Sequence, residues 1–248
     1  MPTGSHAGPD GFSKRTSEVA EQSDASVTFI LRSPDGDQGF PGALECRVRY
    51  SWSDDKALRI DYSAVTDKLT VVNLTNHVYW NLTGDPRRLV TGHQVRLESD
   101  AVLEIDAGLI PTGTRLPVKK TPFDFTSPTE IGRHIDAANA QLKAANGYDH
   151  CWILRGEAGL RLAARVHEPV SGRTLELFTD QPGLQLYTGN FLDGTAKGKG
   201  GAVYPFRTAF CLEPQRFPDA PNQPPFPSAT LRPGEVYEHK MMYRFSVE

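Results

Sequence analysis

Alternation of apolar and polar residues with a period of two is the feature that most restricts the fold of this chain. It covers residues 27–31, 44–52, 58–64, 160–166 and 175–177. Successive side chains on a β-strand point to opposite faces, so each stretch is predicted to be a strand with one buried face. Residues that favour turns separate the stretches at short intervals. The pattern therefore predicts an all-β chain, folded as a sandwich or barrel of antiparallel strands.

Helical signals are confined to one segment, so we expect at most one or two short helices. Ser127 and Pro128 supply a helix N-cap and a first-turn proline, and Glu130 stands where a capping carboxylate is favoured. A weak apolar face follows, and Gly147 is placed to end the helix. That face consists of Ile131, Ile135 and Leu142.

The length and charge of the chain restrict its domain count and its partners. Sandwiches of about this size commonly form one unit, so residues 1–248 are predicted to be a single domain. The formal net charge of -3 offers no basic excess for phosphates, so nucleic acid is not an expected partner. No apolar run approaches the length that spans a bilayer, so no membrane partner is expected. A monomer and a homodimer both remain open.

Three widely spaced cysteines, Cys46, Cys151 and Cys211, argue against a disulfide framework and against a zinc cluster. Such usage fits a reducing compartment, so a cytoplasmic location is expected. The histidines show no spacing typical of a ligand pair, so no metal site is predicted. These are His77, His93, His134, His150 and His167.

Four segments place polar side chains in apolar surroundings and are candidates for a functional site. They are residues 71–82 with His77, 147–150 with Asp149, 183–191 with Gln185, and 210–215 with Glu213. A carboxylate after an apolar strand and before a proline-rich loop (214–227) is partly desolvated, which raises its pKa and makes it a better base. Each segment also has a structural interpretation, such as a core histidine, a turn aspartate or a surface glutamate. Asp149 and His150 are adjacent, so on a strand they point to opposite faces.

Taken together, these segments resemble the aldose 1-epimerase (galactose mutarotase) family. The matching stretches run in order along nearly the whole chain. They are VVNLTNHVYWNL at 71–82, LIPTGTRLPVKKTPFDF at 109–125, GYDH at 147–150, QPGLQLYTGNFLDG at 181–194 and CLEPQRFPDAPNQPPFPSATLRPGE at 211–235. The resemblance implies a large antiparallel β-sandwich of the galactose mutarotase-like supersandwich type.

The resemblance also implies roles for individual residues. Glu213 matches the general base of the family and His77 its general acid. Asp149 and Gln185 match ligands of the sugar hydroxyls. His6 matches a sugar-binding histidine, because the sequence from His6 to Phe12 fits the family frame with one glycine replaced by alanine. The alternative is that residues 4–6, Gly-Ser-His, are a cloning remnant.

The family pattern contains further strands upstream of that histidine, one of which carries a substrate-binding arginine. The chain is therefore expected to be an N-terminally truncated version of the fold. Either its sequence has a late start or it is a shortened natural variant. Unpaired strand edges would then be exposed, which favours weak folding, self-association or weak activity.

The implied reaction interconverts the α and β anomers of free aldohexoses such as glucose and galactose. A base removes the proton of the anomeric hydroxyl while an acid protonates the ring oxygen, and neither metal nor cofactor is needed. The sequence predicts that Glu213 and His77 face each other across a gap the width of a pyranose ring. Two alternatives remain: a mutarotase for hexose 6-phosphates, and a non-catalytic sugar-binding protein of the same fold. The first needs a cationic cluster, which Arg133, Lys119 and Lys120 do not clearly form.

Overall fold

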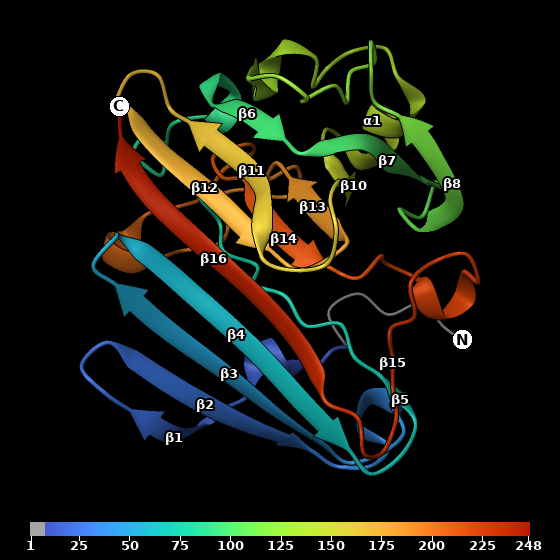
Figure 1. Cartoon of the computed structure of the whole chain (residues 1–248). Coiled ribbons are helices and arrows are strands. Elements are labelled where there is room, and N and C mark those ends of the chain that lie inside the picture. Colours follow the sequence, from blue (N-terminus) through green and yellow to red (C-terminus); the bar gives the residue numbers. More distant parts are fainter. Residues whose placement is uncertain (1–7) are drawn as a thin grey trace.

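The computed structural model describes residues 8–248, and its strands form three antiparallel sheets (Figure 1). The first sheet has nine strands, in the order β1 (Glu18–Gln22), β2 (Ser26–Ser33), β3 (Leu44–Ser53), β4 (Ala57–Thr66), β16 (Tyr237–Val247), β12 (Arg173–Thr179), β11 (Arg161–His167), β6 (Gln94–Leu97) and β9 (Thr129–Glu130). The second has five, in the order β14 (Cys211–Gln215), β13 (Gly183–Tyr187), β10 (Asp149–Leu154), β7 (Ser99–Ile105) and β8 (Pro111–Pro117). The third pairs β15 (Thr230–Leu231) with β5 (Thr70–Val71). The predicted all-β antiparallel architecture is confirmed.

The main core lies between the two large sheets, where β10, β13 and β14 lie against β11, β12 and β16 (Figure 1). Alternate residues of β12 and β16 supply Leu175, Leu177, Met241 and Tyr243, all fully buried. Trp152 of β10 meets them from the other sheet, also fully buried. Burying large side chains of this kind contributes about 1.5–3 kcal/mol each relative to exposure, which holds the sheets face to face.

The first two strands depart from the predicted pattern. In β2 the buried residues are Thr28, Ile30 and Ser33, whereas Val27, Phe29 and Leu31 are only partly buried. The alternation is correct, but the apolar residues on the other face are not in the core. Strand β1 was not expected from its polar sequence, and all five of its residues are exposed. Within residues 8–248 it is an edge strand whose sole partner is β2, so backbone bonding rather than burial forms it.

The predicted helix beginning at Ser127 is wrong in its extent. Residues 129–130 form β9, followed by a 3-10 turn (Ile131–Arg133), and the α-helix α1 covers only Ala140–Ala145. Asn139 is the true N-cap, because its side chain accepts hydrogen bonds from the backbone N–H groups of Gln141 and Leu142. Asn146 ends the helix in the left-handed conformation, one residue before Gly147. Pairing of Thr129 with Val95 of β6 competes with helix formation at the earlier cap.

Pro214 was predicted to begin a loop, but it lies inside β14. Proline has no backbone N–H to donate to a neighbouring strand. It is tolerated here because β14 is at the edge of the five-stranded sheet, so one side of the strand has no neighbouring strand in that sheet. After β14 ends at Gln215, the rest of the proline-rich stretch is irregular except for a 3-10 turn at Ala220–Asn222, and the short strand β15 follows it. Further 3-10 turns lie at Phe12–Lys14, Asp37–Gly39, Val90–Gly92 and Lys199–Gly201.

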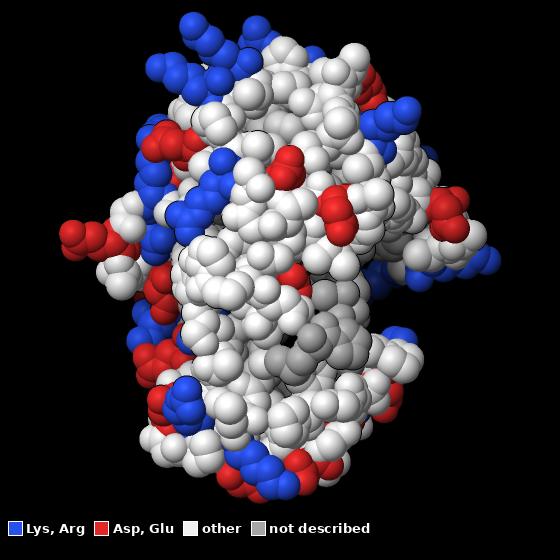
Figure 2. Space-filling model, turned by 90° about the vertical axis from the view of Figure 1, so that its right-hand side faces the viewer, with Lys and Arg blue, Asp and Glu red and all other residues white. Residues whose placement is uncertain are grey.

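One face of the molecule is hollowed near its centre, and uncharged residues cover most of it (Figure 2). Lysine and arginine side chains gather mainly along its upper and left edges in that view. Within residues 8–248, no helix has both the length and the apolar character needed to cross a bilayer.

Candidate active site

Strand register brings three of the predicted site residues onto one face of the five-stranded sheet. Gln185 of β13 lies directly opposite Glu213 of β14, and Asp149 of β10 lies opposite Tyr187 of β13. Directly paired residues share a face, and so do residues two apart on a strand. Asp149, Gln185 and Glu213 therefore point to the same side, away from the core. The neighbouring His150 points into the core and is fully buried, as the alternation predicts.

A row of side-chain hydrogen bonds joins the polar residues on this face. The Gln185 amide nitrogen donates to Asp149 Oδ1 at 2.7 Å. Gln185 Oε1 in turn accepts from the amide of Gln215 at 3.3 Å. A half-buried amide needs such partners, and here they also fix the rotamers of the two predicted sugar ligands. The row leaves part of each side chain directed toward solvent, since both Asp149 and Gln185 are intermediate in burial.

The segment that carries His77 runs along the outer edge of β14. Asn73 exchanges two hydrogen bonds with the backbone of Arg216, each 2.9 Å long, and Thr75 Oγ1 donates to the Pro214 carbonyl at 2.7 Å. Farther along, Trp80 and Phe210 exchange backbone hydrogen bonds of 2.7 and 2.9 Å. These contacts cover a sheet edge that would otherwise expose unpaired groups. They also place residue 77 beside the middle of β14, where Glu213 lies.

His77 and Glu213 meet at close range. The distance from His77 Nε2 to Glu213 Oε1 is 3.5 Å, although 136 positions separate the residues in the sequence. The Glu213 side chain is 10% exposed and that of His77 is 31% exposed, so the pair opens to solvent on the histidine side. A separation of 3.5 Å leaves no room for a pyranose ring between the two groups, so the expected ring-wide gap is wrong. A sugar can instead lie over the pair, since the anomeric hydroxyl and the ring oxygen are bonded to the same carbon.

Burial changes the chemistry of Glu213. Desolvation, with a smaller contribution from the negative charge of Asp149, raises the pKa of the Glu213 carboxyl from 4.5 to about 8. The carboxylate of such a group binds a proton more tightly than the carboxylate of an exposed glutamate does, so it is a stronger base. A perturbed carboxylate beside an imidazole is typical of acid–base sites. The sequence predicted this direction of shift from the position of Glu213 at the end of an apolar strand.

Aromatic rings form one wall beside the pair. The ring of Tyr79 lies 5.0 Å from that of His77, and Tyr187 makes edge contacts with both at about 6 Å. Phe191 stacks on Tyr187 at 6.2 Å, and its backbone N–H donates to the Tyr187 hydroxyl at 2.9 Å. Tyr79 is 49% exposed and Phe191 is 59% exposed. Accessible rings beside polar groups suit a ligand with one apolar face and several hydroxyls.

A third group joins the acid–base pair from the same strand. One donor atom from each of His77, Cys211 and Glu213 lies within 4.8 Å of the others. Cys211 is fully buried, and burial together with the charge of Glu213 raises the pKa of its thiol. The sequence did not predict this cluster, because its members come from segments that only the tertiary structure brings together. Strand alternation could have placed Cys211 and Gln215 beside Glu213, since each is two residues from it.

The turn that leads into β10 is held by buried polar contacts. The Asn190 amide nitrogen donates to the carbonyls of Ala145 and Tyr148, at 2.9 and 2.8 Å. Gly147 has a φ of +138°, and a Cβ at this position would lie 2.4 Å from Asn190 Oδ1. Only glycine fits here. The turn therefore sets where Asp149 enters the sheet.

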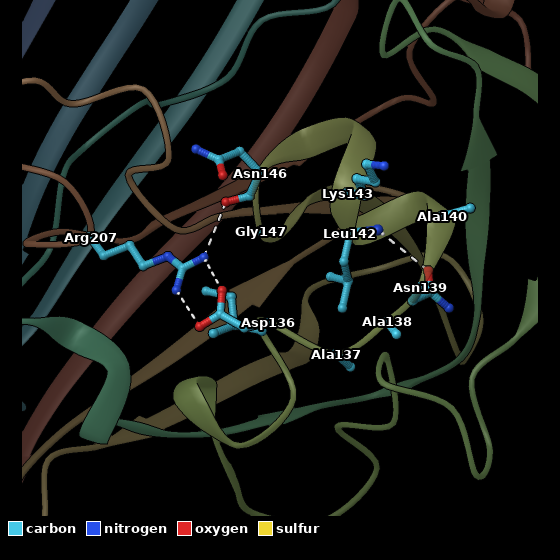
Figure 3. A pocket seen from close by; sticks show the side chains of 11 residues that line it. Asp136, Ala137, Ala138, Asn139, Ala140, Leu142, Lys143, Asn146, Gly147 and Arg207 are labelled. Carbon is cyan, nitrogen blue, oxygen red and sulfur yellow. Dashed lines mark hydrogen bonds and ion pairs between the residues drawn. The ribbon is translucent and has the colours of Figure 1, made fainter.

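A separate hollow of about 440 Å³ lies behind that turn (Figure 3). Arg207 binds Asp136 through two hydrogen bonds of 2.7 and 2.9 Å and also donates to the Asn146 carbonyl at 3.3 Å. The lining of the hollow comes from residues 135–147 and Arg207, and it includes neither His77 nor Glu213. The ion pair on its wall supports the loop after α1, and the hollow is not part of the acid–base site.

One predicted site residue and three histidines with no predicted role remain to be placed. His6 is outside the described residues. His93 is buried, and its Nε2 accepts a hydrogen bond from the Leu82 N–H at 3.0 Å. His134 is exposed, and His167 contacts Thr174 Oγ1 at 3.0 Å. Among the described residues, the histidine brought to the Glu213 carboxylate is His77.

Comparison with known proteins identifies close similarities over nearly the whole chain. A family model described as aldose 1-epimerase matches residues 4–244. Galactose mutarotase from Homo sapiens is 46% identical over 248 residues, covering 99% of this chain and 70% of that protein. Aldose 1-epimerase from Escherichia coli (strain K12) is 41% identical over 246 residues, covering 98% of this chain and 70% of that protein.

Solved structures support the same relationship. A GalM/aldose epimerase homologue from C. elegans superposes with a TM-score of 0.88 at 34% identity, covering 98% of this chain and 72% of that chain. A galactose 1-epimerase from Lactobacillus acidophilus NCFM superposes with a TM-score of 0.81 at 26% identity, covering 98% and 69%.

Proposed function

The chain belongs to the aldose 1-epimerase family, and on that premise we propose that it interconverts the α and β anomers of free aldohexoses such as glucose and galactose. We further propose Glu213 as the general base and His77 as the general acid. The observation that carries this assignment is the 3.5 Å approach of His77 Nε2 to a buried carboxylate oxygen of Glu213. An acid and a base this close can both reach oxygens bonded to one carbon.

The reaction begins with the sugar over the Glu213–His77 pair. The ionised Glu213 carboxylate removes the proton of the anomeric hydroxyl, and the C1–O5 bond breaks. The protonated His77 ring donates its proton to O5, so the ring opens to an aldehyde with no net change in protons. Rotation about the C1–C2 bond exposes the other face of the carbonyl. The two residues then exchange roles, and closure yields the opposite anomer.

Two environmental features favour this proton transfer. Burial raises the proton affinity of the Glu213 carboxylate, with a pKa of about 8, which makes the ionised form a stronger base than an exposed glutamate. The His77 imidazole lies 3.5 Å from the Glu213 carboxylate, close enough for the two groups to act on neighbouring oxygens of one sugar.

The same face supplies sugar recognition. Asp149 and Gln185, fixed by their mutual hydrogen bond, accept from and donate to sugar hydroxyls. Tyr79 and Tyr187 offer ring faces and edges to the C–H groups of the pyranose. We retain His6 as a third sugar ligand on the resemblance of its surrounding sequence.

The partners and location follow from the same proposal. We propose that the enzyme acts in the cytoplasm, as a monomer or homodimer, on small aldoses and not on nucleic acid or membranes. Its three cysteines are unpaired and buried, which agrees with a reducing compartment. We likewise retain the interpretation of residues 1–248 as a single domain.

Polarimetry on freshly dissolved α-glucose and α-galactose tests the catalytic assignment. The variants Glu213→Gln and His77→Ala are each expected to lose about 10²- to 10⁴-fold in kcat, the usual contribution of one proton-transfer group. Matched controls are Glu21→Gln and His134→Ala, because both residues are exposed. A wild-type rate in either site variant, with an unchanged thermal unfolding midpoint, would refute the assignment. Parallel assays with glucose 6-phosphate test the phosphorylated-substrate alternative, which predicts faster turnover of that compound.

A further inference from the structure

The acid–base pair of the proposed site has a third neighbour that the reaction does not use. Mutarotation needs one acid and one base, and Glu213 and His77 fill both roles. Cys211 lies two residues before Glu213 on β14, on the same face of the sheet. The thiol, imidazole and carboxylate have donor atoms within 4.8 Å of one another, and each is a ligand type that zinc binds. We propose that this cluster is an inhibitory zinc site, in which Zn²⁺ competes with the sugar.

The distances are close to those that zinc requires. Tetrahedral bonds of about 2.3 Å to sulfur and about 2.0–2.2 Å to nitrogen or oxygen place neighbouring ligand atoms about 3.3–3.7 Å apart. His77 Nε2 and Glu213 Oε1 are already 3.5 Å apart. The donor atoms of His77, Cys211 and Glu213 all lie within 4.8 Å of one another. The Cys211 sulfur therefore needs to move by no more than about 1 Å to reach these separations. Three protein ligands leave the fourth position for water.

The burial of the three groups defines how the ion enters. Cys211 is fully buried, and the Glu213 side chain is 10% exposed. The His77 side chain is 31% exposed, so the approach is from the histidine side, where the sugar also enters. On binding, Zn–N, Zn–S and Zn–O bonds form, and the thiol proton is released to solvent together with any proton on the coordinating nitrogen or oxygen.

Metal binding has a direct consequence for catalysis. The lone pairs that Glu213 and His77 use to exchange protons become bonds to zinc, so neither residue can act on the sugar. The ion also fills the space over the pair that the anomeric carbon would occupy. Inhibition should therefore be competitive with aldose and reversed by a chelator. The inhibition part rests on the proposed function, whereas the binding part does not.

Zinc titration of the full chain tests the proposal. Mutarotation of galactose is measured in zinc-buffered solutions for the wild type and for Cys211→Ser. Cys46→Ser is the control, because Cys46 is also buried but lies in the other sheet. Serine conserves the volume but is a poor zinc ligand. We expect Cys211→Ser to keep its basal rate and to need at least about tenfold more zinc for half-inhibition. We expect Cys46→Ser to match the wild type. Equal zinc sensitivity of Cys211→Ser and the wild type would overturn the proposal, as would inhibition that galactose does not relieve.

Cobalt supplies a readout that is independent of turnover. Co²⁺ added to the chelator-treated wild type should produce a thiolate-to-metal charge-transfer absorption, which zinc should displace and Cys211→Ser or Cys211→Ala should lack. Absence of that band in the wild type would refute the site even if the protein is an active mutarotase. Its presence in a protein without mutarotase activity would support the site while contradicting the proposed function.

Discussion

Replacing Glu213 by glutamine is expected to stabilise the protein at alkaline pH while it removes the catalytic base. In the wild type, burial raises the pKa of this carboxyl from 4.5 to about 8. Between these two pH values the folded chain keeps the proton and the unfolded chain has lost it. Because the folded state binds more protons there, its stability falls as pH rises. The contribution is fully present below about pH 4.5 and is lost once the pH passes 8.

The magnitude follows from that shift. At about 1.4 kcal/mol for each pH unit, the whole change amounts to up to about 5 kcal/mol, of which about 4 kcal/mol falls between pH 5 and pH 9. The pKa shift can be converted into a free energy of unfolding because Glu213 is only 8% exposed, so solvent screens its charge little. Glutamine has nearly the same shape and cannot ionise, so the variant lacks this pH dependence. Relative to the wild type, Glu213→Gln should therefore gain about 4 kcal/mol on going from pH 5 to pH 9.

Urea unfolding followed by tryptophan fluorescence measures this difference directly. The free energy of unfolding is determined for both proteins at pH 5 and pH 9, and other titrating groups cancel in the comparison. Glu21→Gln on the exposed strand β1 is the matched control and should show no pH-dependent difference. A change below about 1 kcal/mol for Glu213→Gln would show that the carboxyl is not desolvated. Glu213 would then be no stronger a base than an exposed glutamate.

Three further substitutions test how the site is built. Gly147→Ala should lower the free energy of unfolding by about 1–3 kcal/mol, because the new Cβ would meet Asn190 Oδ1 and the backbone is in a left-handed region. An unchanged free energy of unfolding, measured with urea at neutral pH, would contradict this. Gln185→Ala should raise KM for galactose about tenfold with little change in kcat, as expected for a lost ligand hydrogen bond, and an unchanged KM would remove Gln185 from the sugar site. Asn73→Ala breaks two hydrogen bonds to Arg216 and should lower kcat more than it raises KM, since it releases the segment that positions His77. A normal kcat in Asn73→Ala would mean that the contacts of Thr75 and Trp80 are enough to position the His77 segment.

Local periodicity explains why much of the fold could be predicted from the sequence. Side-chain direction on a strand depends only on residue parity, so the opposite orientation of Asp149 and His150 was predictable without a structure. The pKa direction at Glu213 was predictable for a similar reason, because its apolar neighbours in sequence are also its neighbours in space. Parity alone was not sufficient for β2, where Thr28 and Ile30 rather than the more apolar face are buried.

The meeting of the functional groups was decided by the tertiary structure. Nothing local in the sequence sets the distance from His77 to Glu213, which depends on Asn73 and Thr75 binding the edge of β14. The same long-range pairing brings His77 to Cys211 and Glu213 and leaves a gap between His77 and Glu213 that is too narrow for a sugar ring. Strand parity is encoded residue by residue, whereas strand neighbours and desolvation are properties of segments far apart in the chain. The sequence alone therefore determined most of the long strands and, through the family resemblance, the candidate acid and base, whereas the folded sheet determined their geometry.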